Sequence, residues 1–370
     1  MGKHKNIGVL PGDGIGPEVV VEAIKVLEAV AEKYEHTFDF TYADVGAVAI
    51  DKTGNPLPDE TLAICKSSDA FLFGAIGHPK YDNDPQAKVR PEQGLLKLRK
   101  ALGLFANIRP VSAYEALLYM SPLKEEKIKG VDIVVYRELT GGIYFGEKGR
   151  TATDAYDHCT YSALEIDRIS QLAFEAAQNR KGRLTLVDKA NVLETSRLWR
   201  ERVQAMVKTY PKVAVDYMFV DNAAMQMIQN PAQFDVILTE NMFGDIISDE
   251  ASVIGGSMGL LPSASIGVKS AMFEPIHGSY PQATGENIAN PMATILSAAM
   301  MLDHLGLIDE AIDIRQAVKA AINNGMVTSD LSKSRSFGTD RVGDYIVNQI
   351  REDGQGKTFD NIHLGSSTII

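Results

Sequence analysis

The segment Ile7-Gly-Val-Leu-Pro-Gly-Asp-Gly-Ile-Gly-Pro17 decides the fold class of this chain. Its first residues, Ile7–Leu10, form a short apolar run that is typical of a buried strand. After the glycine-rich turn, a helix is predicted to begin at Pro17. One face of that helix carries the apolar residues Val19, Val20, Ala23, Ile24, Leu27, Val30 and Ala31. The order strand, loop, helix predicts an α/β unit at the start of the chain.

The same alternation continues along the sequence. Further strands are predicted at Ala70–Phe73, Ile133–Tyr136, Leu184–Val187, Tyr217–Val220 and Val236–Thr239. Helices are predicted near Leu95–Leu102, Ile166–Asn179, Glu194–Met206, Pro291–Leu305 and Asp309–Asn323. This pattern predicts an α/β protein with a largely parallel sheet. The 370 residues indicate two domains, although no linker composition marks a boundary between them.

Composition excludes several classes of protein. The apolar fraction of 45% and the charged fraction of 23% are those of a globular chain, not of a disordered one. The net charge of −11 argues against nucleic acid or an anionic membrane as partner. Cys65 and Cys159 are too few for a disulfide framework, and we expect two reduced core thiols. The charge-free stretch Ala251–Val268 contains glycines and a proline and predicts a turn region, so we expect a cytoplasmic protein.

Side chains that can perform chemistry follow the predicted strands directly. They are Arg137, Tyr144, Asp188, Lys189, Asn191, Asp221, Asp245 and Asp249. Ligands of open α/β sheets bind beyond the carboxyl ends of the strands, so the set predicts a pocket. Each residue taken alone is more typical of a solvated turn.

Asp245 and Asp249 are four residues apart, which places two carboxylates on one face of a helix. Like charges at that spacing repel each other unless a cation lies between them. Carboxylate oxygens without nearby His or Cys favour Mg²⁺ or Mn²⁺, and Asp221 would add a third ligand. The alternative is a solvent-facing acidic turn formed by Asp249 and Glu250.

A basic segment stands out against the negative net charge. Only Glu92 opposes the six basic residues Lys88, Arg90, Lys97, Arg99, Lys100 and Arg109. The planar guanidinium groups of Arg99, Arg109 and Arg137 are candidates to bind the carboxylates of a small anion. Leu95 and Leu96 are either core residues or the wall of a pocket for a branched alkyl group.

Two glycine patterns resemble known motifs but lack their context. Gly12-Asp-Gly-Ile-Gly16 is one residue short of the dinucleotide fingerprint, which argues against a Rossmann site. Gly255-Gly-Ser-Met-Gly259 lacks the preceding strand that a serine hydrolase requires. The loop Glu274–Ser279 and its continuation Gly285–Asn290 either surround a nucleotide or are structural.

Six segments resemble the isocitrate/isopropylmalate family of β-decarboxylating dehydrogenases, which act on 2-hydroxy acids. They are Leu10–Val19, Leu104–Pro110, Arg137–Gly146, Asp188–Val192, Asn241–Asp249 and Gly259–Ala264. The resemblance extends from about Ile7 to Asn324 and becomes loose beyond Arg335. It implies two α/β lobes: residues 1–104 with 257–370 would bind the nucleotide in a loop site, and residues 105–256 would form a homodimer with shared active sites.

The resemblance is strongest to the branch that uses 3-isopropylmalate. It implies oxidation and decarboxylation of this 2-hydroxy dicarboxylate to 4-methyl-2-oxopentanoate in leucine biosynthesis, with NAD and Mg²⁺ or Mn²⁺. Tyr144 and Lys189 of the partner subunit would be the catalytic residues. Asp245 and Asp249 would bind the metal together with Asp221 of the partner subunit. Substrate contacts would come from Arg99, Arg109, Arg137, Asp221, Glu92, Leu95, Leu96 and Val192. The nucleotide would contact Ile15, Glu274, His277, Gly278, Ser279, Tyr280, Gln282 and Asn290.

One position departs from the pattern of the NAD-dependent relatives. Gln282 stands where those relatives usually have an aspartate that binds the ribose diol and repels a 2′-phosphate. We therefore expect NAD with weaker discrimination against NADP. The alternatives are a relative acting on isocitrate, homoisocitrate, malate or tartrate, and a non-catalytic regulatory subunit. Such a subunit would be expected to lose Tyr144, Lys189 or an aspartate, and all are present.

Overall fold

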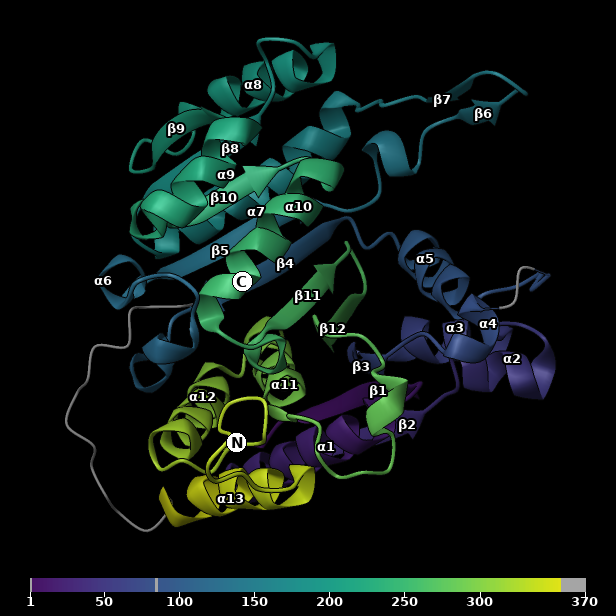
Figure 1. Ribbon diagram of the computed structural model, residues 1–370, viewed down its shortest axis with the longest axis vertical. Helices are drawn as coiled ribbons and strands as arrows, with labels where there is room; N and C mark the ends of the chain where they lie inside the picture. The colour runs from purple at the N-terminus through teal and green to yellow at the C-terminus, as the bar shows by residue number, and fades with distance from the viewer. Residues whose placement is uncertain (1, 84–85, 354–370) are drawn as a thin grey trace. The chain divides into compact units, whose positions relative to one another are not determined.

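The computed structural model describes residues 2–83 and 86–353 and is shown in Figure 1. Most of the predicted tail Arg351–Ile370 lies outside these residues. The chain divides into two compact units. Unit 1 contains the residues up to Gly103 and those that follow from Ser257, and unit 2 contains Leu104–Gly256. Both units are α/β, as the alternation of strands and helices predicts.

Unit 1 contains a twisted sheet with the strand order β2-β1-β3-β12-β11. Its strands are β1 His4–Gly12, β2 Thr37–Tyr42, β3 Ala70–Ala75, β11 Pro262–Ile266 and β12 Ala271–Pro275. Neighbouring strands are parallel except for the antiparallel pair β11 and β12. Ligands of such sheets bind beyond the carboxyl ends of the parallel strands, so the loops at those ends are the candidate binding region of unit 1.

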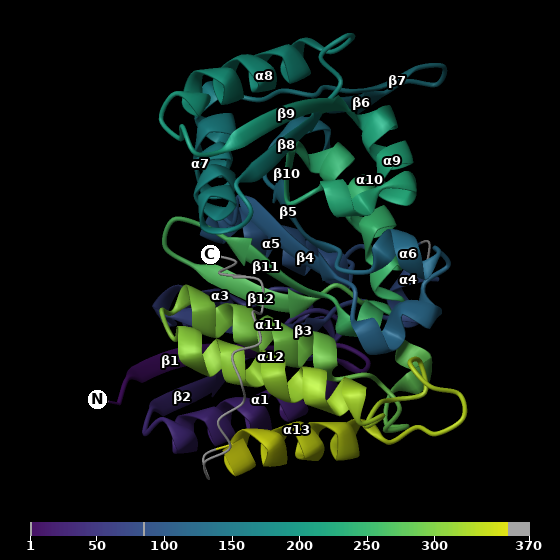
Figure 2. The same cartoon turned by 90° about the vertical axis from the view of Figure 1, so that its left-hand side faces the viewer.

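Helices cover the sheet of unit 1. They are α1 Gly16–Lys33, α2 Ala47–Thr53, α3 Asp59–Ser67, α4 Pro79–Asp82, α5 Pro91–Leu102, α11 Met292–His304, α12 Ile308–Asn323 and α13 Thr339–Asp353. Helix α11 is buried from Met292 to Asp303 because it contacts β11 and β12 on one side and α1 and α12 on others. Figure 2 shows α12 and α13 outside it.

The main strands of unit 2 are ordered β4-β5-β10-β8-β9. They are β4 Ala106–Ser112, β5 Asp132–Glu138, β8 Arg183–Asp188, β9 Ala214–Phe219 and β10 Val236–Thr239. Only β4 and β5 are antiparallel. A separate hairpin is formed by β6 Lys148–Arg150 and β7 Ala155–Asp157, and both views show it projecting from the unit.

The helices of unit 2 lie on both faces of its sheet. They are α6 Glu125–Ile128, α7 Ala163–Asn179, α8 Glu194–Val207, α9 Val220–Gln229 and α10 Asn241–Ser252. Figure 2 shows α7 on one face and α9 and α10 on the other. The core includes Ile133, Val135 and Ile237 from the strands and Ile247 and Ala251 from α10.

Some sequence predictions were wrong in detail. The strand predicted at Tyr217–Val220 ends at Phe219, and Val220 begins α9, so Asp221 lies in a helical turn. The region Ala251–Val268, predicted as turns, contains strand β11. Cys65 is buried as expected, but Cys159 is only half-buried, and both are free thiols. In the described part of the chain, no helix is long and apolar enough to cross a membrane.

Candidate active site

The two aspartates predicted to share a helix face lie together on α10. Its N-terminus is capped by Glu240, whose side chain accepts a hydrogen bond from the backbone N–H of Phe243. Ile247 and Ala251 face the core, which directs Asp245 and Asp249 to the opposite side of the helix. Like charges at this spacing need compensation, and the chain itself supplies it.

Each of these carboxylates is paired with one of the predicted arginines. Arg137 Nη1 lies 2.6 Å from Asp245 Oδ1, and Arg109 Nη1 lies 2.7 Å from Asp249 Oδ1. The expectation that only a cation could relieve their repulsion was therefore incomplete. An alternating cluster of two guanidinium groups and two carboxylates results, and it can accept an anion and a cation together.

Asn241 fixes the guanidinium of Arg137, and the sequence analysis did not single it out. Arg137 Nε donates to the backbone oxygen of Asn241 at 2.9 Å, and Nη2 donates to its side-chain oxygen at 2.8 Å. The amide of Asn241 donates in turn to the backbone oxygen of Gly141. Asn241 is buried, so this arrangement is held rigidly. Its position four residues before Asp245 is the only signal in the sequence.

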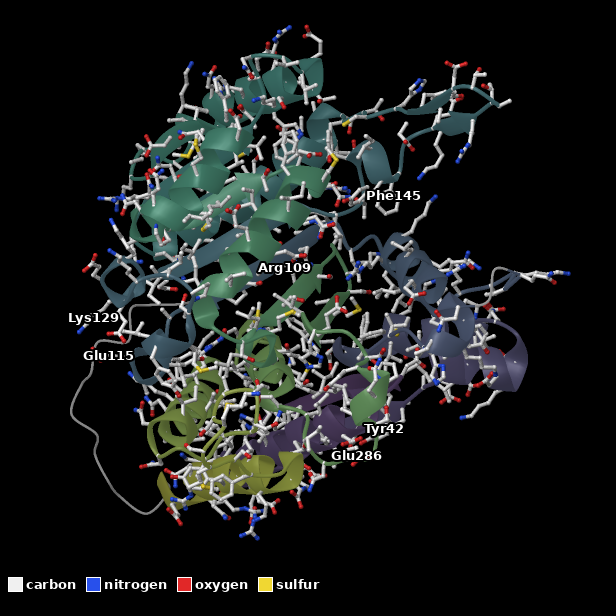
Figure 3. The ribbon with its side chains drawn as sticks, in the orientation of Figure 1. Tyr42, Arg109, Glu115, Lys129, Phe145 and Glu286 are labelled. Carbon is white, nitrogen blue, oxygen red and sulfur yellow. The ribbon has the colours of Figure 1, made fainter. Side chains whose placement is uncertain are left out.

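Arg109, labelled in Figure 3, is oriented by two further residues that the sequence analysis did not identify. Its Nε donates to Asn107 Oδ1 at 2.9 Å, since side chains two residues apart on β4 share a face. Its Nη1 donates to Ser248 Oγ at 2.8 Å. The guanidinium is thus placed before any ligand binds.

Tyr144 belongs to the same cluster. It ends the single 3₁₀ turn Gly142–Tyr144, and its hydroxyl donates to Asp245 Oδ2 at 3.0 Å. A side chain at Gly142 would collide with the Tyr161 ring, so glycine is required for this turn. Partial burial and the neighbouring Asp245 raise the pKa of Tyr144. The phenol therefore remains protonated at neutral pH, as a proton donor must.

Lys189 and Asp221 form a separate pair in unit 2. Their Nζ and Oδ1 atoms are 2.5 Å apart, and the lysine holds the pKa of the Asp221 carboxyl below its ordinary value. Asp221 is largely exposed. Among residues 2–83 and 86–353, no group of three acidic, His or Cys side chains is placed to hold a metal. One chain therefore brings Asp245 and Asp249 together without Asp221.

In unit 1, the predicted substrate residues lie on α5. Arg99 Nη2 is 2.8 Å from Glu274 Oε1, a residue predicted to bind the nucleotide. Arg99 Nε is buried without a hydrogen-bond partner among the described residues. Leu95 is half-buried and Leu96 is 49% exposed, so neither is a core residue. The Glu92 carboxylate lies against Gly77. A Cβ atom added to Gly77 would be 2.9 Å from Glu92 Oε1.

The loop between β12 and α11 contains most of the predicted nucleotide residues, whereas Glu274 lies on β12 and Ile15 directly precedes α1. The short pattern Gly12–Gly16 packs against it: the Ile15 N–H donates to the Ser279 oxygen at 2.8 Å, and Gly14 has φ of 59°. A side chain at Gly14 would collide with that oxygen, so this glycine allows the close packing of the two loops.

The predicted nucleotide residues differ in accessibility. Tyr280, Gln282 and Gly278 are exposed, whereas Ile15, Ser279, Glu274 and Asn290 are buried. Burial lowers the pKa of His277, and its Nε2 has no partner in the described residues. A neutral imidazole nitrogen without a hydrogen-bond partner in the protein can bind a ligand.

The serine of the Gly-x-Ser-x-Gly pattern has no catalytic surroundings. Ser257 follows α10 and the 3₁₀ turn Val253–Gly255 rather than a strand. Its hydroxyl donates to Asp330 Oδ2 and accepts from the Gly259 N–H. Ser257 thus caps the 3₁₀ turn Met258–Leu260, which is a structural role for this hydroxyl.

Comparison with known proteins gives a consistent picture. The profile of the isocitrate/isopropylmalate dehydrogenase family matches residues 6–346. The 3-isopropylmalate dehydrogenase of Bacteroides fragilis is 56% identical over 348 residues, which are 94% of this chain and 99% of that protein. That of Wolinella succinogenes is 53% identical over 363 residues, covering 95% and 100% of the two chains.

A solved structure resembles the fold at lower identity. The isocitrate dehydrogenase of Methylococcus capsulatus superposes with a TM-score of 0.83 at 35% identity, covering 95% of this chain and all of that one. The fold is thus shared between enzymes whose names give different substrates.

Proposed function

Because this chain belongs to the isocitrate/isopropylmalate dehydrogenase family, we propose that it oxidises and decarboxylates 3-isopropylmalate to 4-methyl-2-oxopentanoate with NAD, in leucine biosynthesis. The observation that carries this proposal is the cluster of Arg109, Arg137, Tyr144, Asp245 and Asp249. It combines clamps for carboxylates, oxygen ligands for a hard cation and a proton donor in one place.

In the proposal, the two carboxylates of the substrate bind to Arg109, Arg137 and Arg99. Both guanidinium groups of unit 2 already hold acids, so the substrate exchanges one carboxylate partner for another at little cost. The isopropyl group is assigned to a pocket formed by Glu92, Leu95 and Leu96 of one subunit together with Val192 of the partner subunit. The exposure of Leu96 supports this assignment, because an exposed leucine gains from covering by an alkyl group.

The metal is assigned to Asp245, Asp249 and Asp221 of the partner subunit. Asp245 and Asp249 fit a hard divalent ion, since both offer carboxylate oxygens on one helix face and Asp249 is largely exposed. When bound, Mg²⁺ or Mn²⁺ would supply Lewis-acid polarisation of the oxygen on C2.

Protons move through two side chains in this scheme. Lys189 of the partner subunit, acting as the free amine, accepts the hydroxyl proton and becomes an ammonium as hydride leaves C2 for the nicotinamide. Loss of CO₂ from the resulting β-keto acid leaves an enolate, and Tyr144 donates a proton to its carbon. The position of Tyr144 supports this role, because its hydroxyl lies 3.0 Å from Oδ2 of Asp245 in the cluster that would hold the substrate.

The proposed homodimer is supported by apolar side chains that unit 2 exposes. Met225 and Ile228 on α9 are 52% and 53% exposed, and Ile246 on α10 is 57% exposed. Burying such a surface would stabilise a dimer. The projecting hairpin of β6 and β7 offers a further surface. We place the enzyme in the cytoplasm, where free thiols such as Cys65 and Cys159 stay reduced.

A panel of 2-hydroxy acids tests the proposed activity. We expect a kcat/KM for 3-isopropylmalate at least about tenfold above that for isocitrate, because covering the isopropyl group contributes about 2 kcal/mol. Initial rates of NADH formation with Mn²⁺ measure it, with homoisocitrate, malate and tartrate beside the two acids. Parity between isocitrate and 3-isopropylmalate would refute the pocket assignment, and no NADH with any acid would indicate a non-catalytic subunit.

Comparing NAD with NADP tests the role of Gln282. This exposed glutamine can hydrogen-bond a ribose diol, but it does not repel a 2′-phosphate as a carboxylate does. We expect NAD to be preferred, and Gln282→Asp to widen that preference by at least about fivefold in kcat/KM. Faster turnover with NADP than with NAD would overturn the assignment of the cofactor.

A further inference from the structure

Lys189 directly follows a buried ion pair in unit 2. Strand β8 ends at Asp188, whose side chain is only 2% exposed. Arg200 on α8 binds this carboxylate with two parallel hydrogen bonds, from Nε at 2.9 Å and from Nη2 at 2.8 Å. A bidentate pair fixes the direction of the carboxylate as well as its distance. The peptide that leads into Lys189 is thereby fixed too.

Helix α8 also holds the next two residues, Lys189 and Ala190, through hydrogen bonds to Ser196 and Arg197. The Lys189 N–H donates to Ser196 Oγ at 3.0 Å, and Arg197 Nε donates to the Ala190 oxygen at 3.0 Å. The Ala190 N–H donates to Asp188 Oδ1 at 3.1 Å. Helix α8 therefore tracks the turn after β8 over successive residues, with Arg200 at the strand end.

Arg200 also contacts the neighbouring strand. Its guanidinium carbon lies 5.3 Å from the ring centre of Tyr217 and 5.4 Å from that of Phe219. These are cation–π distances. Within the described residues, strand β9 is the last strand of its sheet and β8 is its neighbour, and Asp188 pairs with Phe219 in the register. Arg200 thus clamps the ends of both strands together.

Both strand ends lead to a residue with a proposed role in the reaction. Asp188 precedes Lys189, and Asp221 follows Phe219 by two residues. The Lys189 ammonium lies 5.9 Å from the Phe219 ring centre and 2.5 Å from Asp221 Oδ1. Arg200 therefore contacts Asp188, which precedes Lys189, and Phe219, which lies two residues before Asp221.

We propose that Arg200 is a positioning residue that sets the placement of Lys189 and Asp221 relative to each other. The inference rests on the proposed function, in which both side chains serve the active site of the partner subunit. A displacement of about 1 Å in a catalytic group can cost about 10²-fold in rate, so the clamp would act on kcat. The nucleotide residues belong to unit 1, and NAD binding would be unaffected.

The test compares Arg200→Lys and Arg200→Ala with Arg202→Lys and Arg202→Ala. Arg202 lies on the same helix and also pairs with an aspartate, Asp167, but it contacts neither strand end. Lysine keeps the charge opposite Asp188 yet lacks the planar fork. We expect Arg200→Lys to lower kcat at least about tenfold while the KM for NAD stays within about twofold. Arg202→Lys should match the wild type.

Chemical rescue separates positioning from folding. Millimolar guanidinium ion should raise kcat of Arg200→Ala at least about fivefold by occupying the vacated site, and should leave Arg202→Ala unchanged. If Arg200→Ala does not fold, Arg200→Lys decides alone. An Arg200→Lys kcat within about threefold of wild type would overturn the inference, as would an equal loss in Arg202→Lys or a folded Arg200→Ala without rescue.

A readout independent of activity separates this inference from the proposed function. Hydrogen exchange in Arg200→Lys should accelerate in peptides covering 188–193 and 219–224 and nowhere else in unit 2. If the wild type forms no NADH with 3-isopropylmalate, the proposed function fails, while localised exchange still supports the clamp. Unchanged exchange in both segments overturns the clamp even in an active enzyme.

Discussion

Replacing Lys189 by methionine is expected to lower kcat by about 10³-fold, because the hydroxyl proton then has no acceptor when hydride leaves C2. Methionine keeps much of the aliphatic length of lysine and removes only the amine, whose nitrogen lies 5.9 Å from the Phe219 ring centre. The measurement is NADH formation at saturating 3-isopropylmalate and NAD. Lys181→Met, another lysine of unit 2, is the control and should retain wild-type turnover.

Mixing two inactive variants tests the shared site. Asp245→Asn should also be inactive, because it removes a proposed metal ligand. A dimer of Lys189→Met and Asp245→Asn chains contains one site with both defects and one site with neither. After unfolding and refolding together at equal concentration, the mixture should reach about a quarter of the wild-type activity, since random pairing in a twofold-symmetric dimer makes half of the dimers mixed.

The outcome of this mixing experiment depends on where Lys189 acts. If Lys189 served the site of its own chain, every site in a mixed dimer would contain a defect and activity would stay near zero. We expect the first result, because among the described residues Asp221 does not join Asp245 and Asp249 in one group of acidic side chains. Separately refolded variants, mixed afterwards without unfolding, are the matched control.

The sequence predicted those features that depend on local periodicity. The spacing of Asp245 and Asp249 placed both on one face of α10, and strand β10 has the predicted bounds. Strands without a strong apolar run were missed. β2 is exposed at alternate positions because it is an edge strand, and β11 contains Pro262 and two serines. Their strand conformation is decided by neighbouring strands that are distant in sequence.

The residues that position the candidate site residues were harder to predict than the residues that would contact the ligand. Arg109 and Arg137 stood out because a carboxylate ligand requires guanidinium groups. Asn241 and Arg200 act on other side chains rather than on a ligand, and their partners lie 104 and 12 residues away in the chain. Only the packing of α10 against β5 and of α8 against β8 brings these pairs together.

Replacing Tyr144 by phenylalanine is expected to lower kcat by about 10²–10³-fold with a much smaller change in the KM for 3-isopropylmalate. The ring remains, and Asp245 keeps its bond to Arg137, so the carboxylate clamp is intact. Only the proton donor is lost. Tyr119→Phe, at another tyrosine of unit 2 whose residue as a whole is largely exposed, is the control and should leave both constants unchanged.

The first turnover of the Tyr144→Phe enzyme locates the step at which the phenol acts. Hydride transfer and loss of CO₂ precede protonation of the enolate carbon, so the variant should form NADH rapidly up to about one equivalent per site and then slow down. Absence of this burst would place Tyr144 in the oxidation step instead. Because burial and Asp245 raise the pKa of Tyr144, the phenol is protonated throughout the neutral range, and the burst should not change between pH 6 and pH 8.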